Sequence, residues 1–418
     1  MRRTLVLELN EFNNQVLIEG ARIHGLTHIK SVLAMHHSRT ICAERIEGFD
    51  LDPWNQWVSV HTGLTVSEHG VRHLDQPSKN LYQIWERLSG ANVRWGVWGP
   101  PNATIGDSEF PPAFFVPDPW SSDQVATPKQ LEKFLSLPRY YAKNYLNSKR
   151  LELLVATLRT LNYCLQPNHI AALIRELPLC VSIAWKSRLK DYGLFNLFDL
   201  VNTINFISWA RKEDTHRNIL YLNALAHTQH HHWDEVSLQS GALKQSLECL
   251  NCILGMLLNE FSNSRIVILN ALSQQQEQAT RFLYKPKKPE QLLAILGIEY
   301  RRIETLMTHD AYLYFDSSED MKIAKSQLQR VQVERQSLFD VQDSDIESKC
   351  LFFQIGIWDD LPENAVIKLG KTVIVFYDHI QKINKRTGSH TWTGDVYCND
   401  KVIPNEVRNS EVLSYVFS

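Results

Sequence analysis

Histidines gathered in one short segment are the first candidates for chemistry. In LYLNALAHTQHHHWDE (220–235), an apolar run ends at Asn223, His227 follows four residues later, and His230, His231 and His232 come behind it. A spacing of four places two side chains on one face of a helix, as metal sites built on a helix require. The segment therefore predicts a metal site on a helix that follows a strand. A solvated helix end rich in histidine has the same pattern, and this alternative stays open.

Polar side chains also follow other short apolar runs. Asn10 and Glu11 come after LVLEL, and Asn270 comes after RIVIL. Because ligands of open α/β sheets bind at the carboxyl ends of the strands, these positions are candidates for a site. Asn10 and Asn223 are equally typical of strand-end turns, in which the side chain binds only the local backbone.

A helix with polar side chains is predicted after DPW. Asp52 can cap it and Pro53 can occupy its first turn, which indicates a helix over 54–62 that ends at Gly63. Its tryptophans lie three residues apart and favour packing, with stacking on a sugar or nucleotide as the alternative. The polar residues that this helix offers to a ligand are Asn55 and Ser59.

The elements that must position these residues alternate along the chain. Apolar runs typical of strands lie at 4–9, 40–46, 93–98, 218–222, 265–269 and 371–377, and helical periodicity lies between them, as at 81–88, 241–260 and 290–296. Such alternation predicts an α/β fold with a mostly parallel sheet flanked by helices. Residues 127–216 are rich in Leu, basic and aromatic residues. We expect them to form a helical insertion that caps the strand ends of a core made of 1–126 and 217–418.

Composition narrows the class of protein. The 418 residues are 44% hydrophobic and 22% charged with a net charge of −2, so no basic excess indicates nucleic-acid binding. The apolar run at the start is too short for a signal sequence or a transmembrane segment. Seven scattered cysteines argue against a disulfide framework, and Cys249 and Cys252 lie in an apolar helical run typical of core thiols. We therefore expect a cytoplasmic protein.

Five segments, in order, resemble the alkaline phosphatase superfamily, in particular its type I phosphodiesterase/nucleotide pyrophosphatase-like branch. They run from about Leu5 to Gly394 and exclude the helical insertion. The residues that fit the family's Ser-x-x-Thr-Gly, His-Gly, Asp-x-x-x-His and late Gly-x-His-x-x-x-Gly motifs are Ser59, Thr62, Gly63, His69, Gly70, His227, Gly388, His390 and Gly394. The resemblance implies an alkaline-phosphatase-like core in which His227 and His390 bind one metal ion. The segments also resemble a divergent bacterial subfamily associated with surface-polysaccharide gene clusters. This resemblance implies a role in polysaccharide biosynthesis.

The chain departs from the family at the positions that carry most of its chemistry. Pro53 stands where the nucleophilic Thr or Ser is expected, and Asn223 replaces the aspartate of Asp-x-x-x-His. Ala271 and Leu272 replace an Asp-His pair that binds the second metal, and neither side chain can bind an ion. The N-terminal carboxylate is displaced to Glu11.

The resemblance then implies a divergent phosphodiesterase- or phosphatase-like hydrolase. A metal-bound water would hydrolyse a phosphate or sulfate ester, such as a glycan precursor, with a single zinc or manganese ion as cofactor. The implied roles are metal binding for Asn10, Asn223, His227 and His390, general base for Glu11 or His230, and substrate binding for Asn55 and Ser59. The alternative is a non-catalytic protein that uses the same fold to recognise a phosphorylated glycan or a biosynthetic partner.

Overall fold

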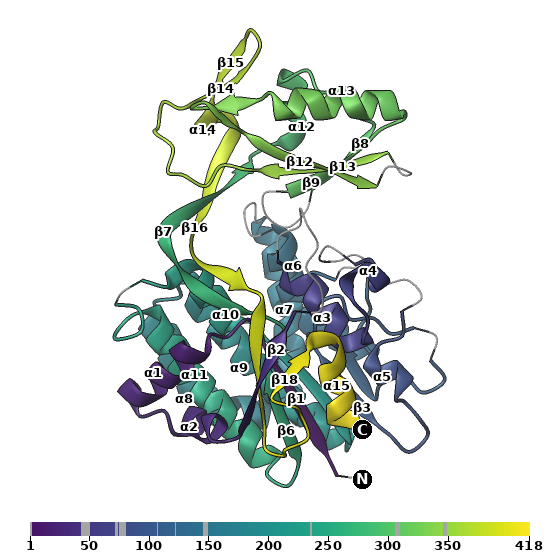
Figure 1. The fold of residues 1–418 in the computed structure, drawn as a ribbon. Helices are drawn as coiled ribbons and strands as arrows, with labels where there is room; N and C mark the ends of the chain where they lie inside the picture. The colour runs from purple at the N-terminus through teal and green to yellow at the C-terminus, as the bar shows by residue number, and fades with distance from the viewer. Residues whose placement is uncertain are drawn as a thin grey trace. The chain divides into compact units, whose positions relative to one another are not determined.

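The computed structural model describes residues 2–42, 51–71, 74, 81–106, 108–121, 123–144, 149–234, 236–305, 310–345 and 349–418. The chain forms two compact units, one of residues 1–276 and 388–418 and the other of 277–387. Strands β7 (Ser273–Pro286) and β16 (Ile380–Thr391) pair with each other and carry the chain between the units (Figure 1). This division differs from the expected one, in which 217–418 belonged to a single core.

The larger unit is built on an eight-stranded sheet with the order β18-β2-β17-β6-β1-β5-β3-β4. All neighbouring strands are parallel except β17, which runs antiparallel between β2 and β6. The predicted α/β class with a mostly parallel sheet is therefore confirmed. The strands are β1 (Thr4–Leu9), β2 (His36–Ile41), β3 (Trp95–Trp98), β4 (Phe114–Val116), β5 (Arg217–Leu222), β6 (Arg265–Leu269), β17 (Thr393–Cys398) and β18 (Glu406–Arg408). Part of the strand expected at 40–46 lies outside the described residues.

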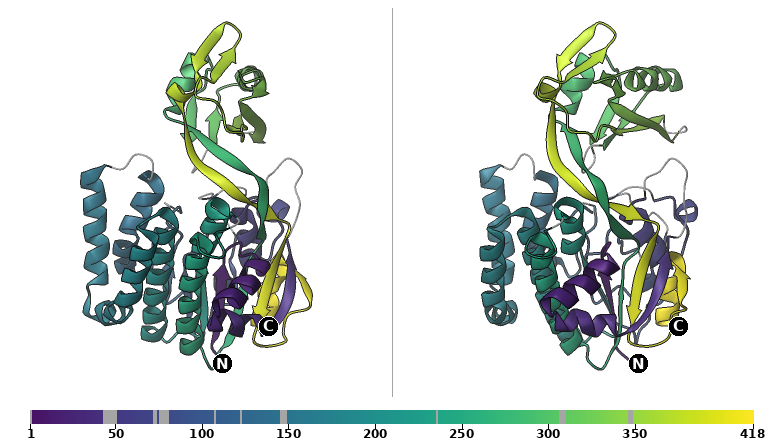
Figure 2. Two further views of the ribbon diagram at one scale, coloured as in Figure 1. Left: turned by 90° about the vertical axis from the view of Figure 1, so that its left-hand side faces the viewer. Right: turned by 60° about the vertical axis from the view of Figure 1, so that its left-hand side comes forward.

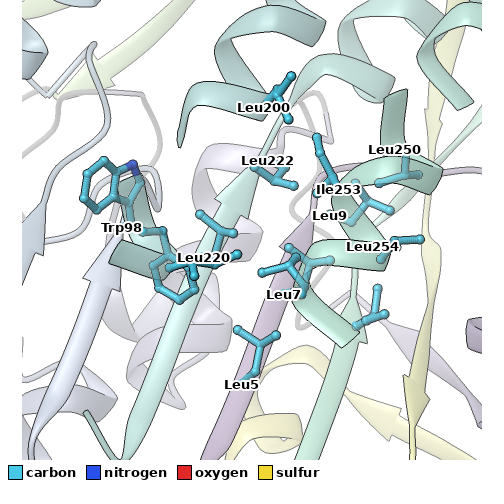
Figure 3. Close-up of a cluster of buried hydrophobic side chains, with 14 of the residues drawn as sticks. Leu5, Leu7, Leu9, Trp98, Leu200, Leu220, Leu222, Leu250, Ile253 and Leu254 are labelled. Carbon is cyan, nitrogen blue, oxygen red and sulfur yellow. The ribbon is translucent and has the colours of Figure 1, made fainter. Parts of the chain in front are cut away.

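Strand β1 lies at the centre of this sheet and is buried on both faces. Side chains alternate between the faces of a strand, so Leu5, Leu7 and Leu9 point to one side. There they pack with Leu220 and Leu222 of β5 and with helix α11 (Ala242–Glu260), as Figure 3 shows. On the opposite face, Val6 packs against Trp57 of helix α3 (Pro53–Thr62).

Helices cover both faces of the sheet. The face that carries Leu5 and Leu7 is covered mainly by α1 (Asn14–His24), α2 (Thr27–Leu33), α9 (Asp191–Lys212) and α11. The opposite face is covered by α3, α5 (Ile84–Arg87) and α15 (Asn409–Phe417), next to the short helix α4 (Val66–His69). Helix α3 ends as predicted, with Gly63 in the left-handed conformation at φ 74°.

The segment 127–216 is helical, as the sequence predicts. It forms η1 (Lys129–Leu131), α6 (Glu132–Asn144), α7 (Arg150–Cys164), α8 (Pro167–Ser187) and α9. The long helices of this segment lie side by side in Figure 2. Leu200, Phe206 and Trp209 of α9 belong to the same apolar core as the sheet. Helix α9 is therefore part of the layer on the sheet face, while the role of this segment as a cap stays a prediction.

The smaller unit, 277–387, has two four-stranded antiparallel sheets and its own apolar core. One sheet has the order β12-β13-β9-β8, and the other the order β11-β10-β14-β15. Their bounds are β8 (Arg302–Thr305), β9 (Asp310–Tyr314), β10 (Gln332–Val333), β11 (Gln336–Ser337), β12 (Phe339–Asp345), β13 (Cys350–Ile355), β14 (Val366–Leu369) and β15 (Thr372–Val375), with helices α12 (Pro289–Ile295), α13 (Ser318–Gln329) and α14 (Phe376–His379). The strand expected at 371–377 is thus β15 followed by α14, outside the large sheet. Among all the residues described, no helix is both long and apolar enough to cross a membrane.

Candidate metal site

Three separate elements bring polar side chains to one edge of the large sheet. Strands β1 and β5 are parallel and end at Leu9 and Leu222, and each is followed by an asparagine. Helix α10 (Ala224–His232) begins directly after β5. Because β17 is antiparallel, its first residues lie at this same edge, and His390 precedes them on β16. The carboxyl ends of the parallel strands therefore meet the residues before β17.

Glu11, His230 and His390 converge at this edge. The distance from Glu11 Oε2 is 2.7 Å to His230 Nε2 and 3.2 Å to His390 Nε2, and the two Nε2 atoms are 3.3 Å apart. The Glu11 side chain is almost fully buried, and both imidazoles are mostly buried. One carboxylate oxygen and two ring nitrogens thus face a common point.

The other ring nitrogen of each histidine faces a backbone carbonyl. His230 Nδ1 lies 3.3 Å from the carbonyl oxygen of Gly388, and His390 Nδ1 makes a short contact with that of Leu51. A carbonyl can only accept, so each Nδ1 carries the proton and donates it. In the neutral form of the rings, this tautomer leaves the Nε2 lone pairs facing each other and Glu11. Three lone pairs at this separation require a proton or a cation between them.

The Glu11 carboxylate is held by further donors. Asn10 Nδ2 donates to Oε1 at 2.9 Å, and Gln274 Nε2 donates to Oε2. Burial raises the pKa of Glu11, but when His390 and His230 are protonated their charges and hydrogen bonds outweigh burial and hold the pKa well below its usual value. Glu11 is therefore ionised at neutral pH.

Asn10, expected as a metal ligand, lies beside Glu11, and Asn223, also expected as a ligand, lies beside Asn10. Asn10 Nδ2 donates to Asn223 Oδ1 at 2.8 Å, and Asn10 Oδ1 accepts from the indole of Trp57 at 2.8 Å. Both amide oxygens therefore accept hydrogen bonds from protein groups. In this arrangement the asparagines orient Glu11 and do not themselves face the histidines.

His227 belongs to a different cluster, with Asp191 and His232. His232 Nε2 lies 2.9 and 3.0 Å from the two Asp191 oxygens, and His227 Nε2 lies 3.3 Å from Oδ2. The two histidines hold the pKa of Asp191 below its usual value although burial raises it. Phe195 stacks on His227 at 3.8 Å between ring centroids. The resemblance placed His227 and His390 at one ion, whereas the structure directs them to two clusters.

Asp199 fixes the start of helix α10, which carries three of these histidines. Its carboxylate accepts from the backbone N–H of Ala224 at 2.7 Å and of Asn223 at 3.0 Å. Burial raises the pKa of Asp199 to about 7, although these hydrogen bonds lower it. Neither Asp191 nor Asp199 was predicted, because each acts on residues more than twenty positions away and has no local motif.

The helix predicted to bind substrate is buried. Ser59 Oγ lies 3.0 Å from His69 Nε2, and His69 Nδ1 accepts from the backbone N–H of Val71 at 3.0 Å. His69 therefore carries its proton on Nε2 and donates it to Ser59, so it does not act as a base for that hydroxyl. Asn55 Oδ1 accepts from Gln56 Nε2 at 3.2 Å. Pro53 occupies the first turn of the helix, as the sequence predicts.

The strand end after β6 has a structural role. Asn270 Nδ2 donates to the carbonyl of Phe12 at 2.7 Å, and its Oδ1 accepts from the backbone N–H of Asp395 at 2.7 Å. Ala271 and Leu272 are fully buried. This strand end therefore joins β6 to β17 and offers no ligand at the two positions where the family has Asp-His.

No protein-family model and no curated protein sequence matches the chain. One solved structure similar to it is murine ectonucleotide pyrophosphatase / phosphodiesterase 5, an inactive variant in complex with AMP. The sequence identity is 11% and the TM-score 0.47, and the match covers 100% of this chain and 94% of that one. Another is phosphonoacetate hydrolase from Sinorhizobium meliloti 1021 in complex with phosphonoformate, at 14% identity and a TM-score of 0.45, covering 99% and 95%. Because these scores are below 0.5, the role of the site is inferred from this chain's own side chains.

Proposed function

We propose that the chain binds one divalent transition-metal ion, zinc or manganese, at Glu11, His230 and His390, and hydrolyses a phosphate or sulfate ester there. The observation that carries this proposal is the convergence of Glu11 Oε2, His230 Nε2 and His390 Nε2 within 3.3 Å of one another. A single cation would stabilise all three lone pairs.

The donor set fits such an ion. Two imidazole nitrogens and one carboxylate oxygen are usual ligands of zinc and of related transition metals, and three protein ligands leave positions open for a substrate. Metal-binding histidines almost always donate their other ring N–H to a carbonyl or carboxylate, which fixes the tautomer. His230 and His390 have that contact, to Gly388 and Leu51. The buried Glu11 carboxylate supplies the negative charge.

The Asp191 cluster is less suited to an ion. His227 and His232 both direct Nε2 to the Asp191 carboxylate. With their protons on Nε2, both rings donate to Asp191, so hydrogen bonds alone satisfy the cluster. We therefore assign Asp191, His227 and His232 to joining α9 and α10, and keep a single ion in the proposal.

The chemistry follows from what the site offers and what it lacks. When bound, the ion would polarise an ester oxygen and lower the pKa of a water molecule. Ser59 accepts a hydrogen bond from His69 and Pro53 has no hydroxyl, so neither is an activated nucleophile. We therefore propose direct attack by water, without a covalent intermediate. Glu11 and His230, expected as general bases, bind the ion in this proposal.

The substrate and location are also part of the proposal. A phosphorylated small molecule or glycan precursor fits a hydrolase of this kind and the resemblance to subfamilies linked to polysaccharide biosynthesis. All seven cysteines are free thiols, which agrees with a cytoplasmic location. The alternative, a binding protein without turnover, is favoured by the burial of Ser59 and by Pro53.

The test begins with chelator-treated protein reloaded with zinc or manganese. We expect one ion per chain by mass spectrometry of the metal, and slow, metal-dependent hydrolysis in a panel of nitrophenyl phosphates, phosphodiesters, sulfates and sugar phosphates. Glu11→Gln and His390→Ala should lose both ion and turnover, whereas His232→Ala, on the helix that carries His230, should keep both. Absence of a bound ion in the wild type refutes the proposal. If an ion is bound but no ester is hydrolysed, the hydrolase proposal is refuted in favour of the alternative, a binding protein without turnover.

A further inference from the structure

Helices α7 and α8 expose regular stripes of large apolar side chains. On α7, Leu151, Leu154, Leu158 and Leu161 are exposed at spacings of three and four, so they lie on one face of the helix. On α8, the exposed residues with the same kind of spacing are Ile174, Leu177, Val181 and Trp185. Leu151 is 74% exposed and Trp185 is 84% exposed. Single exposed leucines are scattered on the surfaces of many proteins, whereas a continuous stripe of large apolar side chains marks an interaction site.

The same segment is strongly basic. Residues 149–190 contain seven Lys or Arg and two Asp or Glu, a net charge of +5 in a chain whose net charge is −2. The basic residues are Lys149, Arg150, Arg159, Arg175, Lys186, Arg188 and Lys190. The whole-chain charge conceals this local excess. An apolar face with flanking Lys and Arg is typical of helices that lie at the surface of an anionic membrane.

We infer that the α7–α8 surface, defined by the two stripes above and these basic residues, docks onto an anionic lipid surface. The apolar stripes enter the boundary between headgroups and acyl chains, and the basic side chains contact the lipid phosphates. Trp185 stands beside Lys186 and close to Arg188, and this pairing of aromatic and cationic residues is frequent at membrane interfaces. The inference is independent of the metal site.

Two observations favour lipid over a second copy of this chain. A two-fold interface brings identical patches together, so the excess of positive charge would face itself. Pro178 lies inside α8, between Leu177 and Val181, and removes a backbone hydrogen bond there. A continuous helix-to-helix seam requires regular helices, whereas a fluid lipid surface accommodates an interrupted one.

The test is co-sedimentation of the full chain with vesicles of phosphatidylcholine alone or with about a third of phosphatidylglycerol, at two salt concentrations. We expect binding to the anionic vesicles that weakens with salt. Leu154→Ser with Leu158→Ser should abolish it. Ile323→Ser with Val373→Ser is the matched control, because these exposed apolar residues lie in the other unit. Circular dichroism and thermal unfolding establish that each variant is folded.

The contribution of charge is measured with Arg150→Gln, Arg159→Gln and Arg188→Gln, since Lys149, Arg175 and Lys186 already pair with acidic residues. Each removed charge should weaken binding on the order of five-fold, and the triple variant on the order of 100-fold. Brominated lipid should quench fluorescence in the wild type and less in Trp185→Phe. Equal binding to neutral vesicles overturns the inference. So does absence of vesicle binding, whether the chain is then monomeric or forms a dimer that the leucine variants break.

Discussion

The substitution Glu11→Gln separates the charge of the buried carboxylate from its shape. Both Glu11 oxygens accept from side-chain amides, Oε1 from Asn10 Nδ2 and Oε2 from Gln274 Nε2. A glutamine at this position has one acceptor oxygen, so its own NH₂ group must face one of the two donors. Neither neighbour can turn over freely. Asn10 Oδ1 is held by the Trp57 indole, and Gln274 Nε2 also donates to the carbonyl of Ala226 at 3.1 Å.

The magnitude follows from this geometry. A donor forced against a donor in a buried site costs about 1–3 kcal/mol of unfolding free energy. The loss for metal binding is larger, because the variant lacks the negative charge. Changes to groups that merely support a ligand weaken metal affinity ~10–100-fold, so removal of the ligand charge should weaken it by about 100-fold or more. That is about 2.7 kcal/mol or more of binding free energy.

Glu86→Gln is the matched control. Glu86 is also buried, and its two oxygens accept from the backbone N–H groups of Gln83 at 2.8 Å and Gly106 at 2.6 Å. The same loss of an acceptor should lower its stability by a similar amount. Urea unfolding should show a lower free energy of unfolding in both variants. Titration calorimetry with zinc and manganese should show a lower metal affinity in Glu11→Gln alone. Wild-type zinc affinity in Glu11→Gln would refute the assignment of Glu11 as a ligand.

Three further results are expected. The pKa of Asp199 is raised to about 7 in the folded chain, from an unfolded value near 3.9. As pH rises from 4 to 7, the unfolded chain therefore releases the Asp199 proton while the folded chain keeps it. The contribution of Asp199 to the free energy of unfolding should fall by about 4 kcal/mol over this range and then stay level. Urea unfolding of wild type and Asp199→Asn across this range should differ by that slope, and parallel curves would contradict it. Ser59→Ala should lower stability by about 1 kcal/mol through the lost hydrogen bond with His69 but leave zinc affinity within about two-fold, and a large loss of affinity would place Ser59 in the site. His227→Ala should retain the ion that His390→Ala loses, and loss in both would restore the single site that the resemblance implies.

The large sheet could be predicted where local pattern decides structure. Strands β1 and β6 have the predicted bounds, because fully buried parallel strands appear as short apolar runs between polar turns. Helix α3 was predicted from Asp52, Pro53 and Gly63, although the Asp52 side chain makes no capping hydrogen bond. The unit 277–387 was not predicted as such. Several of its strands are short and half-exposed, such as β8 and β15, so their apolar pattern is weak.

The site could be predicted in its residue types but not in its pairings. Glu11 and His230 were candidates as general bases, because they follow strand ends, and His390 was a candidate metal ligand through the resemblance to the family's late glycine turn. The partner of His227 was not, since Asp191 lies on another helix 36 residues earlier. The orientation of His227 is set by two long-range contacts, one with the Asp191 carboxylate and one with the Phe195 ring. Spacing of four within α10 cannot reveal which outside group each histidine meets.

The position of His390 also affects how the protein is made. His230 and His390 are 160 residues apart in sequence, and the whole unit 277–387 lies between them. At a synthesis rate of roughly 5–20 residues per second, His390 is added about 10–30 s after His230. During that interval the nascent chain has Glu11 and the first imidazole but not the second. The complete set of proposed ligands therefore appears only after the second unit has been synthesised, so a growing chain that binds an ion there would capture it late, when the fold that holds it is nearly finished.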